Sequence, residues 1–262
     1  MRFRSTGVRA GLLIAAACVV AACSSPSPPP PAPPPPAPSA PATAPPTLDG
    51  WKLTLPTANE KGDAATMDPA VVAPPYLTTD PAGGLVFWAP VAGATTKNSD
   101  HARTELNSLT NFAAGTERHS LTATVVVNQV PAEGKDVIIA QIHGADDISS
   151  VPYVMLHWSD GALRVVVKQQ QSGSAAQSYP LTGDVPLGAA FDIGITDNGD
   201  GTMTFTANHE GDTPMATAPV PAAFSGATVR FQAGAYQQDV SPGTTAAPDD
   251  GARVTFSALT IN

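Results

Sequence analysis

Short stretches rich in β-branched and aromatic residues recur from about residue 50 to the end of the chain, and proline or glycine interrupts nearly every gap between them. No stretch keeps the apolar period of an amphipathic helix. Strand-length segments separated by turn residues predict an all-β fold, a β-jelly roll or sandwich of two antiparallel sheets with a concave substrate-binding cleft. The expected strands are 85–89, 122–130, 137–143, 153–158, 163–168, 191–196, 202–207, 228–238 and 252–260.

One turn has a distinctive acidic composition. The segment Asp197-Asn198-Gly199-Asp200-Gly201 separates two of the expected strands and has the residues of a β-hairpin turn. A calcium loop is the alternative, but the ligand order of an EF-hand and its distal glutamate are missing. We therefore expect a hairpin here and no metal site.

The first residues have the features of an export signal. Arg2, Arg4 and Arg9 are followed by the apolar run 11–20, which is shorter than the roughly 20 residues of a membrane span. The run ends in Ala21-Ala22-Cys23, which resembles the end of a bacterial lipoprotein signal. We expect residues 1–22 to be removed and Cys23 to be lipidated, which would anchor the protein to a membrane at the cell surface or in the periplasm. Ordinary cleavage and secretion is the alternative.

Residues 23–48 are predicted to form a tether. Between Ser24 and Thr47 lie 13 of the chain's 28 prolines, mixed with alanine and serine. This composition cannot build a core and favours extended polyproline II, which would reach on the order of 70 Å at about 3.1 Å per residue. Residues 49–262 contain no cysteine, so neither a disulfide nor a thiolate metal site is expected in this single domain.

The charge of residues 49–262 restricts the possible partners. They contain 10 lysines and arginines against 22 acidic residues, a formal net charge of −12. Nucleic acid is excluded as a partner because it requires a basic surface. An anionic substrate would have to be held by local cations within a cleft.

Three segments combine a strand pattern with unusual polar residues. They are Arg103-Thr104-Glu105-Leu106-Asn107, Gln141-Ile142-His143 and the run 230–238, RFQAGAYQQ. Alternate residues of a strand share a face. In each segment the polar residues should therefore lie on one face: Arg103, Glu105 and Asn107 in the first, Gln141 and His143 in the second, and Gln232, Tyr236 and Gln238 in the third. Their apolar neighbours should face a core; these are Leu106, Ala140, Ile142, Phe231, Ala233 and Ala235. The polar face would then carry a cation, amides, an imidazole and a phenol.

This set of groups suits proton abstraction next to a carboxylate. In a uronate, removal of the C5 proton adds a second negative charge, which a cation and amide donors can stabilise. Arg103 and Gln141 fit that task, and Asn107 could assist. His143 and Tyr236 are the candidates for the base and for the acid that protonates O4.

The three segments resemble motifs of the alginate lyases of polysaccharide lyase family 7. That family carries an Arg-Ser/Thr-Glu-Leu/Val-Arg segment, a Gln-Ile/Val-His segment and a Tyr-Phe-Lys-Ala-Gly-x-Tyr-Asn-Gln segment in this order. The opening Trp51-Lys52-Leu53-Thr54-Leu55-Pro56 and the segment Thr95-Thr96-Lys97-Asn98-Ser99 are also similar. The resemblance covers nearly all of residues 49–262 and implies a monomeric jelly-roll lyase that acts on a polyuronate without a cofactor.

The resemblance also implies residue roles. Arg103 and Gln141 would neutralise the carboxylate, Tyr236 would be the acid and for some linkages the base, and His143 would be the base for guluronate. Ile142 points towards substrates that contain guluronate. Gln238 would contact substrate. The other candidate substrate-binding residues are Glu105, Asn107, Arg230 and Gln232, and Glu105 is also expected to hold Arg103 in place.

Three positions depart from the family pattern. Asn107 replaces a second arginine, Gln232 replaces a lysine and Arg230 replaces a tyrosine. Two positive charges of the family pattern are therefore missing from the expected cleft, although Arg230 could supply one of them. These departures leave another uronate polymer, such as a glucuronan, open as the substrate.

Two other classes of protein compete with a lyase. A carbohydrate-binding lipoprotein of the same fold would bind without turnover, but binding alone does not require both Tyr236 and His143. A glycoside hydrolase would need two carboxyl groups about 5–10 Å apart, and no paired Asp/Glu motif lies on an expected strand.

Overall fold

The computed structural model describes residues 45–239 and 246–262. The expected signal peptide, Cys23 and nearly all of the expected tether lie outside these ranges. Within them, no helix is long and apolar enough to cross a membrane.

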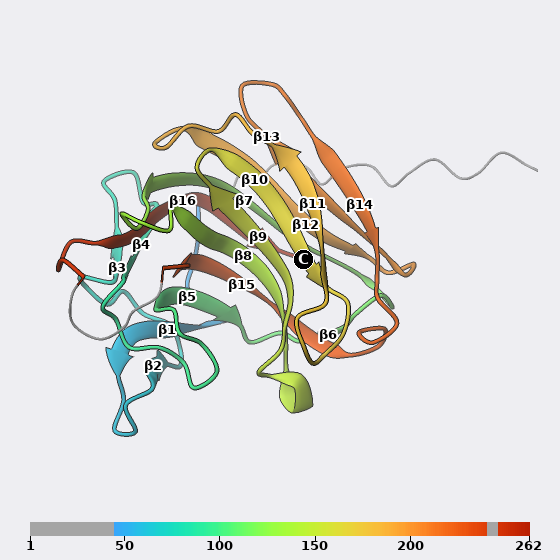
Figure 1. Cartoon of the computed structure of the whole chain (residues 1–262), viewed down its shortest axis with the longest axis horizontal. Helices are drawn as coiled ribbons and strands as arrows, with labels where there is room; N and C mark the ends of the chain where they lie inside the picture. The colour runs from blue at the N-terminus through green and yellow to red at the C-terminus, as the bar shows by residue number, and fades with distance from the viewer. Residues whose placement is uncertain (1–44, 240–245) are drawn as a thin grey trace, which may run out of the picture. The chain divides into compact units, whose positions relative to one another are not determined.

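Two antiparallel sheets form the domain (Figure 1). The first has the order β11-β10-β9-β8-β15-β5-β1-β2, with β6 also paired to β15. Its strands are β1 (Trp51–Ala58), β2 (Ala64–Met67), β5 (Arg103–Ser108), β6 (Phe112–Ala113), β8 (Asp136–Gly144), β9 (Pro152–Ser159), β10 (Ala162–Lys168), β11 (Ala176–Thr182) and β15 (Thr228–Gln237).

The second sheet has the order β14-β13-β12-β7-β16-β4-β3. Its strands are β3 (Leu77–Thr79), β4 (Leu85–Pro90), β7 (Arg118–Gln129), β12 (Ala190–Asn198), β13 (Thr202–Asn208), β14 (Met215–Pro219) and β16 (Gly251–Ile261). A short 3₁₀ helix, η1 (Asp146–Ile148), follows β8. The all-β jelly-roll prediction is therefore confirmed.

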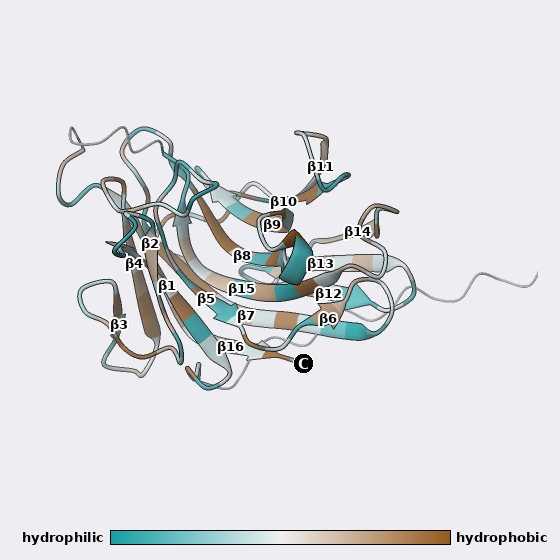
Figure 2. Cartoon of the chain, turned by 90° about the horizontal axis from the view of Figure 1, so that it is seen from below, coloured by the Kyte–Doolittle hydropathy of each residue, from teal (hydrophilic) through white to brown (hydrophobic). Residues whose placement is uncertain are grey.

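The core lies between the two sheets, and brown and teal bands alternate along the strands in Figure 2. Leu106, Ile142, Ala233 and Ala235 all belong to this core. Their burial places the alternate residues of β5, β8 and β15 on the opposite, outer face of the first sheet. The alternation predicted from the sequence is thus correct for all three segments.

The acidic segment 197–201 forms the predicted hairpin between β12 and β13. The Asp197 carboxylate is buried and accepts backbone N–H bonds from Gly115 at 2.7 Å and Gly199 at 3.0 Å. Burial raises the pKa of Asp197, and these two hydrogen bonds oppose the rise. Asp197 therefore stabilises the turn, which explains why the segment is acidic.

Gly234 allows β15 to lie close to β5. Its φ is +155°, and a Cβ atom at this position would lie 2.4 Å from the carbonyl oxygen of Thr104. Any other residue would push the two strands apart. Since Gly234 pairs with Glu105 in the sheet, this close approach sets the spacing beneath the polar residues.

Candidate active site

The three polar segments lie on three adjacent strands. Strand β15 pairs with β5 on one side and β8 on the other, as Figure 1 shows. In this register Gln232 is opposite both Asn107 and Gln141, Tyr236 is opposite Arg103, and Arg230 is opposite His143. Segments far apart in the sequence thus form one continuous polar surface, as the alternation predicted.

This surface is the floor of a cleft with a volume of about 370 Å³. The cleft is lined by residues of six strands of the first sheet and by the loops 96–99 and 149–150. Four cations line it, namely Lys52, Lys97, Arg103 and Arg230, and no Asp or Glu is among its lining residues. The cleft is therefore locally basic although the domain is acidic, as an anionic ligand requires.

Arg103 is held from below by a carboxylate. Its Nη1 lies 3.3 Å from Oε2 of Glu105, and both side chains are buried. Glu105 Oε1 also accepts a 2.6 Å hydrogen bond from Nε2 of Gln141. Burial raises the pKa of Glu105, while Arg103 and Gln141 act in the opposite direction.

Glu105 was a candidate both for substrate contact and for holding Arg103 in place; it has no exposed surface and does not line the cleft. A carboxylate at this depth requires a cation and a donor, and Arg103 and Gln141 supply them. Its place in the structure is that of a support for the two residues above it.

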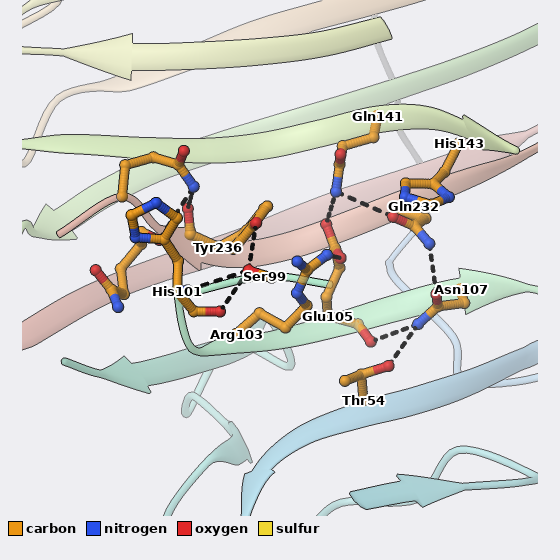
Figure 3. Close-up of polar contacts among 12 residues, drawn as sticks. Thr54, Ser99, His101, Arg103, Glu105, Asn107, Gln141, His143, Gln232 and Tyr236 are labelled. Atoms are coloured by element: carbon orange, nitrogen blue, oxygen red, sulfur yellow. Dashed lines mark hydrogen bonds and ion pairs between the residues drawn. The ribbon is translucent and has the colours of Figure 1, made fainter. Parts of the chain in front are cut away.

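Tyr236 lies at one end of the floor, packed against the guanidinium group of Arg103 (Figure 3). The Cζ atom of Arg103 is 3.5 Å from the centre of the Tyr236 ring. The Tyr236 hydroxyl is 2.8 Å from Oγ of Ser99. Ser99 also donates its hydroxyl hydrogen to the carbonyl of His101 at 3.1 Å, so Tyr236 is left as the donor to Ser99.

Ser99 and His101 were not predicted as site residues. Ser99 appeared only as part of a segment similar to the family, and His101 was not among the candidates. The ring of His101 lies edge-on to Tyr236 at 6.2 Å, and its Nδ1 bonds to the carbonyl of Asp239 at 2.7 Å. The fold of the loop before β5 brings both residues to Tyr236, and no strand pattern reveals such a contact.

His143 lies at the other end of the floor. Its Nδ1 is 3.1 Å from the carbonyl oxygen of Gly144, so in the neutral ring Nδ1 carries the hydrogen and Nε2 keeps its lone pair. The pKa of His143 is lowered to about 4, mainly by burial and also by the positive charges of Arg103 and Arg230, while the bond to Gly144 acts in the opposite direction. At neutral pH this imidazole can accept a proton.

A chain of neutral hydrogen bonds crosses the floor between these two ends. Nε2 of Gln141 donates to Oε1 of Gln232 at 3.0 Å, and Nε2 of Gln232 donates to Oδ1 of Asn107 at 2.6 Å. Nδ2 of Asn107 donates to Oγ1 of Thr54 at 3.1 Å. We call Gln141, Gln232, Asn107 and Thr54 the amide strip; it stands where the family pattern would place two cations (Figure 3).

The remaining candidates are partly in the cleft. Arg230 and Gln238 line it as predicted. The Nδ1 atom of His157 bonds to Asp136 at 2.9 Å, and His157 is not among the lining residues. Within the described ranges, no group of three or more His, Cys, Asp or Glu side chains could hold a metal ion.

A concave jelly-roll sheet that holds a basic cleft with a tyrosine, a histidine and a buried Arg–Glu pair is the arrangement of a polysaccharide lyase. The family model for alginate lyase matches residues 47–262. The chain therefore belongs to the alginate lyase family, and it is a polysaccharide lyase that acts on polyuronate.

Similar proteins agree with this assignment. An alginate lyase from Klebsiella pneumoniae is 26% identical in an alignment of 275 positions that covers 81% of this chain and 88% of that protein. A solved alginate lyase from Pseudomonas aeruginosa is 25% identical with a TM-score of 0.73 and covers 83% of this chain and 99% of that one.

A second solved structure is alginate lyase A1-II′, a member of polysaccharide lyase family 7. It is 29% identical with a TM-score of 0.70, and the match covers 82% of this chain and 95% of that one. A Tyr-to-Phe variant of A1-II′ was solved with the product GGG, and a variant with an additional His-to-Asn change was solved with the substrate GGMG.

Proposed function

We propose that the chain cleaves its polyuronate within this cleft, with Arg103, Gln141, His143 and Tyr236 as the residues that act on the reacting sugar. The observation that carries the proposal is the position of Tyr236 and His143 at two ends of one floor, in a cleft lined by four cations and no acid. Arg103 would bind the carboxylate, and Gln141 would complete its site.

The reaction is a β-elimination. A base removes the C5 proton, the electron pair of that bond forms the C4–C5 double bond, and the C4–O4 bond breaks. O4 then takes a proton from the acid, so the products are a new chain end and a 4,5-unsaturated uronate. The positive charge of Arg103 lowers the barrier by stabilising the charge that develops on the carboxylate.

The acid and base roles follow from the hydrogen positions. Tyr236 carries a proton that it donates to Ser99, so it can transfer this proton to O4. His143 presents an unprotonated Nε2 and can act as the base where the C5 proton lies on the opposite face from O4. The A1-II′ complexes, obtained with tyrosine and histidine variants, support these two residue types at the reacting sugar.

The substrate contacts beyond the reacting sugar are assigned to Arg230 and Gln238, with Gln232 and Asn107 on the floor between them. Both A1-II′ ligands contain G residues, and we extend a preference for such alginate to this chain through Ile142. We also propose that the protein acts as a monomer.

The experiment is the ultraviolet absorbance of residues 49–262 incubated with polymannuronate, polyguluronate, mixed alginate and glucuronan. The unsaturated product absorbs in the ultraviolet, so the polymer that gives a rise identifies the substrate. Folded protein that gives no rise with any polymer, but is retained on one of them in a pull-down, would instead be a binding module.

We further propose that the protein is a lipoprotein outside the cytoplasm, anchored through Cys23 and held off the membrane by residues 23–48. The residues before Cys23 and the proline content of the tether support this proposal. In a bacterial host, the full chain should fractionate with membranes, and Cys23→Ser should move it to the soluble fraction. Equal membrane binding of both chains would contradict lipidation.

A further inference from the structure

Arg230 is a cation of the cleft that has no counter-ion in contact with it. Its side chain is half-buried, and its Nε is buried without a hydrogen-bond partner. Among residues 45–239 and 246–262, no ion pair or side-chain hydrogen bond involves this guanidinium group. Burial lowers the pKa of Arg230, and Asp146 and Glu105 act in the opposite direction from beyond ion-pair distance. Since arginine keeps its proton in proteins, a half-buried positive charge remains for a ligand to neutralise.

The other arginine of the cleft already has a counter-ion. Arg103 lies 3.3 Å from the buried carboxylate of Glu105 and packs against the ring of Tyr236. A substrate carboxylate at Arg103 therefore shares this cation with Glu105, whereas a carboxylate at Arg230 would be its only close partner. The planar guanidinium group can bind a carboxylate through two parallel N–H···O bonds. Arg230 is thus suited to a strong contact with a carboxylate of the polymer.

The position of Arg230 separates it from the carboxylate of the reacting sugar. Arg230 is directly opposite His143 in the pairing of β15 with β8, and Gln232 is opposite Gln141. Two residues along a strand span about 7 Å, so Arg230 lies beyond the row that contains Gln141. A carboxylate bound at Arg230 therefore belongs to a different sugar from the one held by Arg103 and Gln141.

The sequence places this cation at a position of its own. The family pattern has tyrosine and lysine where this chain has Arg230 and Gln232. Positions 230 and 232 share a face of β15, and both residues line the cleft. The positive charge of β15 is therefore still within the cleft but stands two residues away, next to His143.

We propose that Arg230 binds the carboxylate of the sugar next to the reacting uronate, so that two adjacent uronates are the unit that this enzyme recognises. This inference rests on the proposed β-elimination and deepens its substrate class. A neutral sugar at this place would leave the guanidinium group of Arg230 unpaired in a half-buried site. A site built for a polar contact discriminates strongly against a ligand that lacks the matching group.

The test uses the polyuronate that yields unsaturated product and the same polymer after random reduction of half its carboxyl groups to neutral sugars. Initial rates per glycosidic bond are measured well below KM. If both sugars must be uronates, the wild-type rate should fall to about a quarter; if only the reacting sugar must be one, it should fall to about half.

The variant Arg230→Tyr removes the charge and introduces the residue of the family pattern. Its kcat/KM on the intact polymer should fall about tenfold or more, as expected for one hydrogen-bonded contact between charged groups. Its rate on the half-reduced polymer should be about half of its own rate on the intact one, because the neighbouring sugar is no longer selected. Rates are compared at about pH 8, above the ordinary pKa of histidine, so that His143 is neutral in both proteins.

A matched control carries the same substitution outside the cleft. Arg118 is exposed on β7 of the second sheet and does not line the cleft. Arg118→Tyr should therefore keep the wild-type rate and the fall to about a quarter. If Arg230→Tyr does not fold, Arg230→Gln replaces it, and the wild-type comparison of the two polymers requires no variant.

The outcomes separate the two proposals. A wild-type rate that falls only to half, or an Arg230→Tyr rate that still falls to a quarter, would overturn the role of Arg230 and leave the lyase intact. No unsaturated product from folded protein with any of the four polymers would overturn the proposed chemistry, and this inference with it.

Discussion

The hydroxyl group of Tyr236 can be removed with little change to the shape of the cleft. In Tyr236→Phe, the ring should remain packed against Arg103, and only the bond to Ser99 is lost. A general acid contributes about 10²–10⁴-fold to rate, so kcat should fall by that factor in an ultraviolet product assay. Tyr179→Phe, whose ring lies against Phe205 outside the cleft, is the control and should keep wild-type activity. Full activity of Tyr236→Phe would refute its role.

Ser99 acts on Tyr236 as a positioning residue. In Ser99→Ala the phenol loses the partner that orients its proton, so kcat should fall about fivefold while KM stays nearly constant, in line with roughly 1 kcal/mol for one hydrogen bond. Ser99→Thr keeps a hydroxyl and should restore most of the rate. A change in KM alone would show that Ser99 contacts substrate instead.

The low pKa of His143 predicts the acid limb of the pH profile. Because burial lowers its pKa from 6.5 to about 4, the ring stays neutral and able to accept a proton down to about pH 4. On polyguluronate, the acid limb of kcat/KM should lie near pH 4, since this parameter reports the free enzyme. A limb near pH 6.5 would contradict the burial of the ring.

The same shift couples His143 to stability. The unfolded chain binds a proton on this ring near pH 6.5 and the folded chain only near pH 4. The stability associated with neutral His143 is therefore fully present above pH 6.5 and is lost as the pH falls towards 4. In denaturant titrations across this pH interval, the free energy of unfolding of the wild type should fall more than that of His143→Asn.

At the residue scale, alternation within strands located Arg103, Gln141, His143 and Tyr236 correctly. It could not locate Ser99, because that residue reaches Tyr236 from a loop 137 positions away in the sequence. It also left substrate contact open for Glu105 beside a role in holding Arg103, because a shared face does not reveal depth. Only the packing above Glu105 shows that Arg103 and Gln141 cover it.

Among the elements, the central strand β5 depends on a buried charge pair. Removal of the carboxylate in Glu105→Ala leaves Arg103 as an unpaired buried cation and Gln141 without an acceptor. The free energy of unfolding should fall by about 3 kcal/mol or more in denaturant titrations.

The control for this variant is Glu117→Ala. The Glu117 side chain is 81% exposed and pairs with His119 only at 4.0 Å, so its loss should cost no more than about 0.5 kcal/mol. A loss below about 1 kcal/mol for Glu105→Ala would mean that the pair contributes little to the stability of the sheet.

The sequence predicted the central strands and missed those at the edges. The strands β11, β14, β2 and β3 end the two sheets, and none of them was expected from the pattern of residues. Edge strands are short or carry residues such as Pro180 and Pro219, and they bury only part of their side chains, so their alternation is weak. Each central strand has a hydrogen-bonded neighbour on both sides, and its alternation of apolar and polar residues is strong.

For the molecule as a whole, a basic cleft lies in an acidic domain, and this contrast favours binding of an anionic polymer at the cleft. The sequence predicted local cations within a cleft of an acidic domain, because Arg103 and Arg230 fall on expected strands. It could not show that Asn107 and Gln232 join into a hydrogen-bonded strip, since that depends on the register of β5, β15 and β8.

The most direct test of the central claim is the mass of the products that residues 49–262 release from alginate. Elimination transfers a proton from C5 and adds no water, whereas hydrolysis adds one water at each cleavage. We predict that every fragment with a newly formed non-reducing end is lighter by one water than its hydrolysis counterpart, and that Tyr236→Phe releases almost none of these fragments. Fragments with the full mass of hydrolysis products would contradict the account.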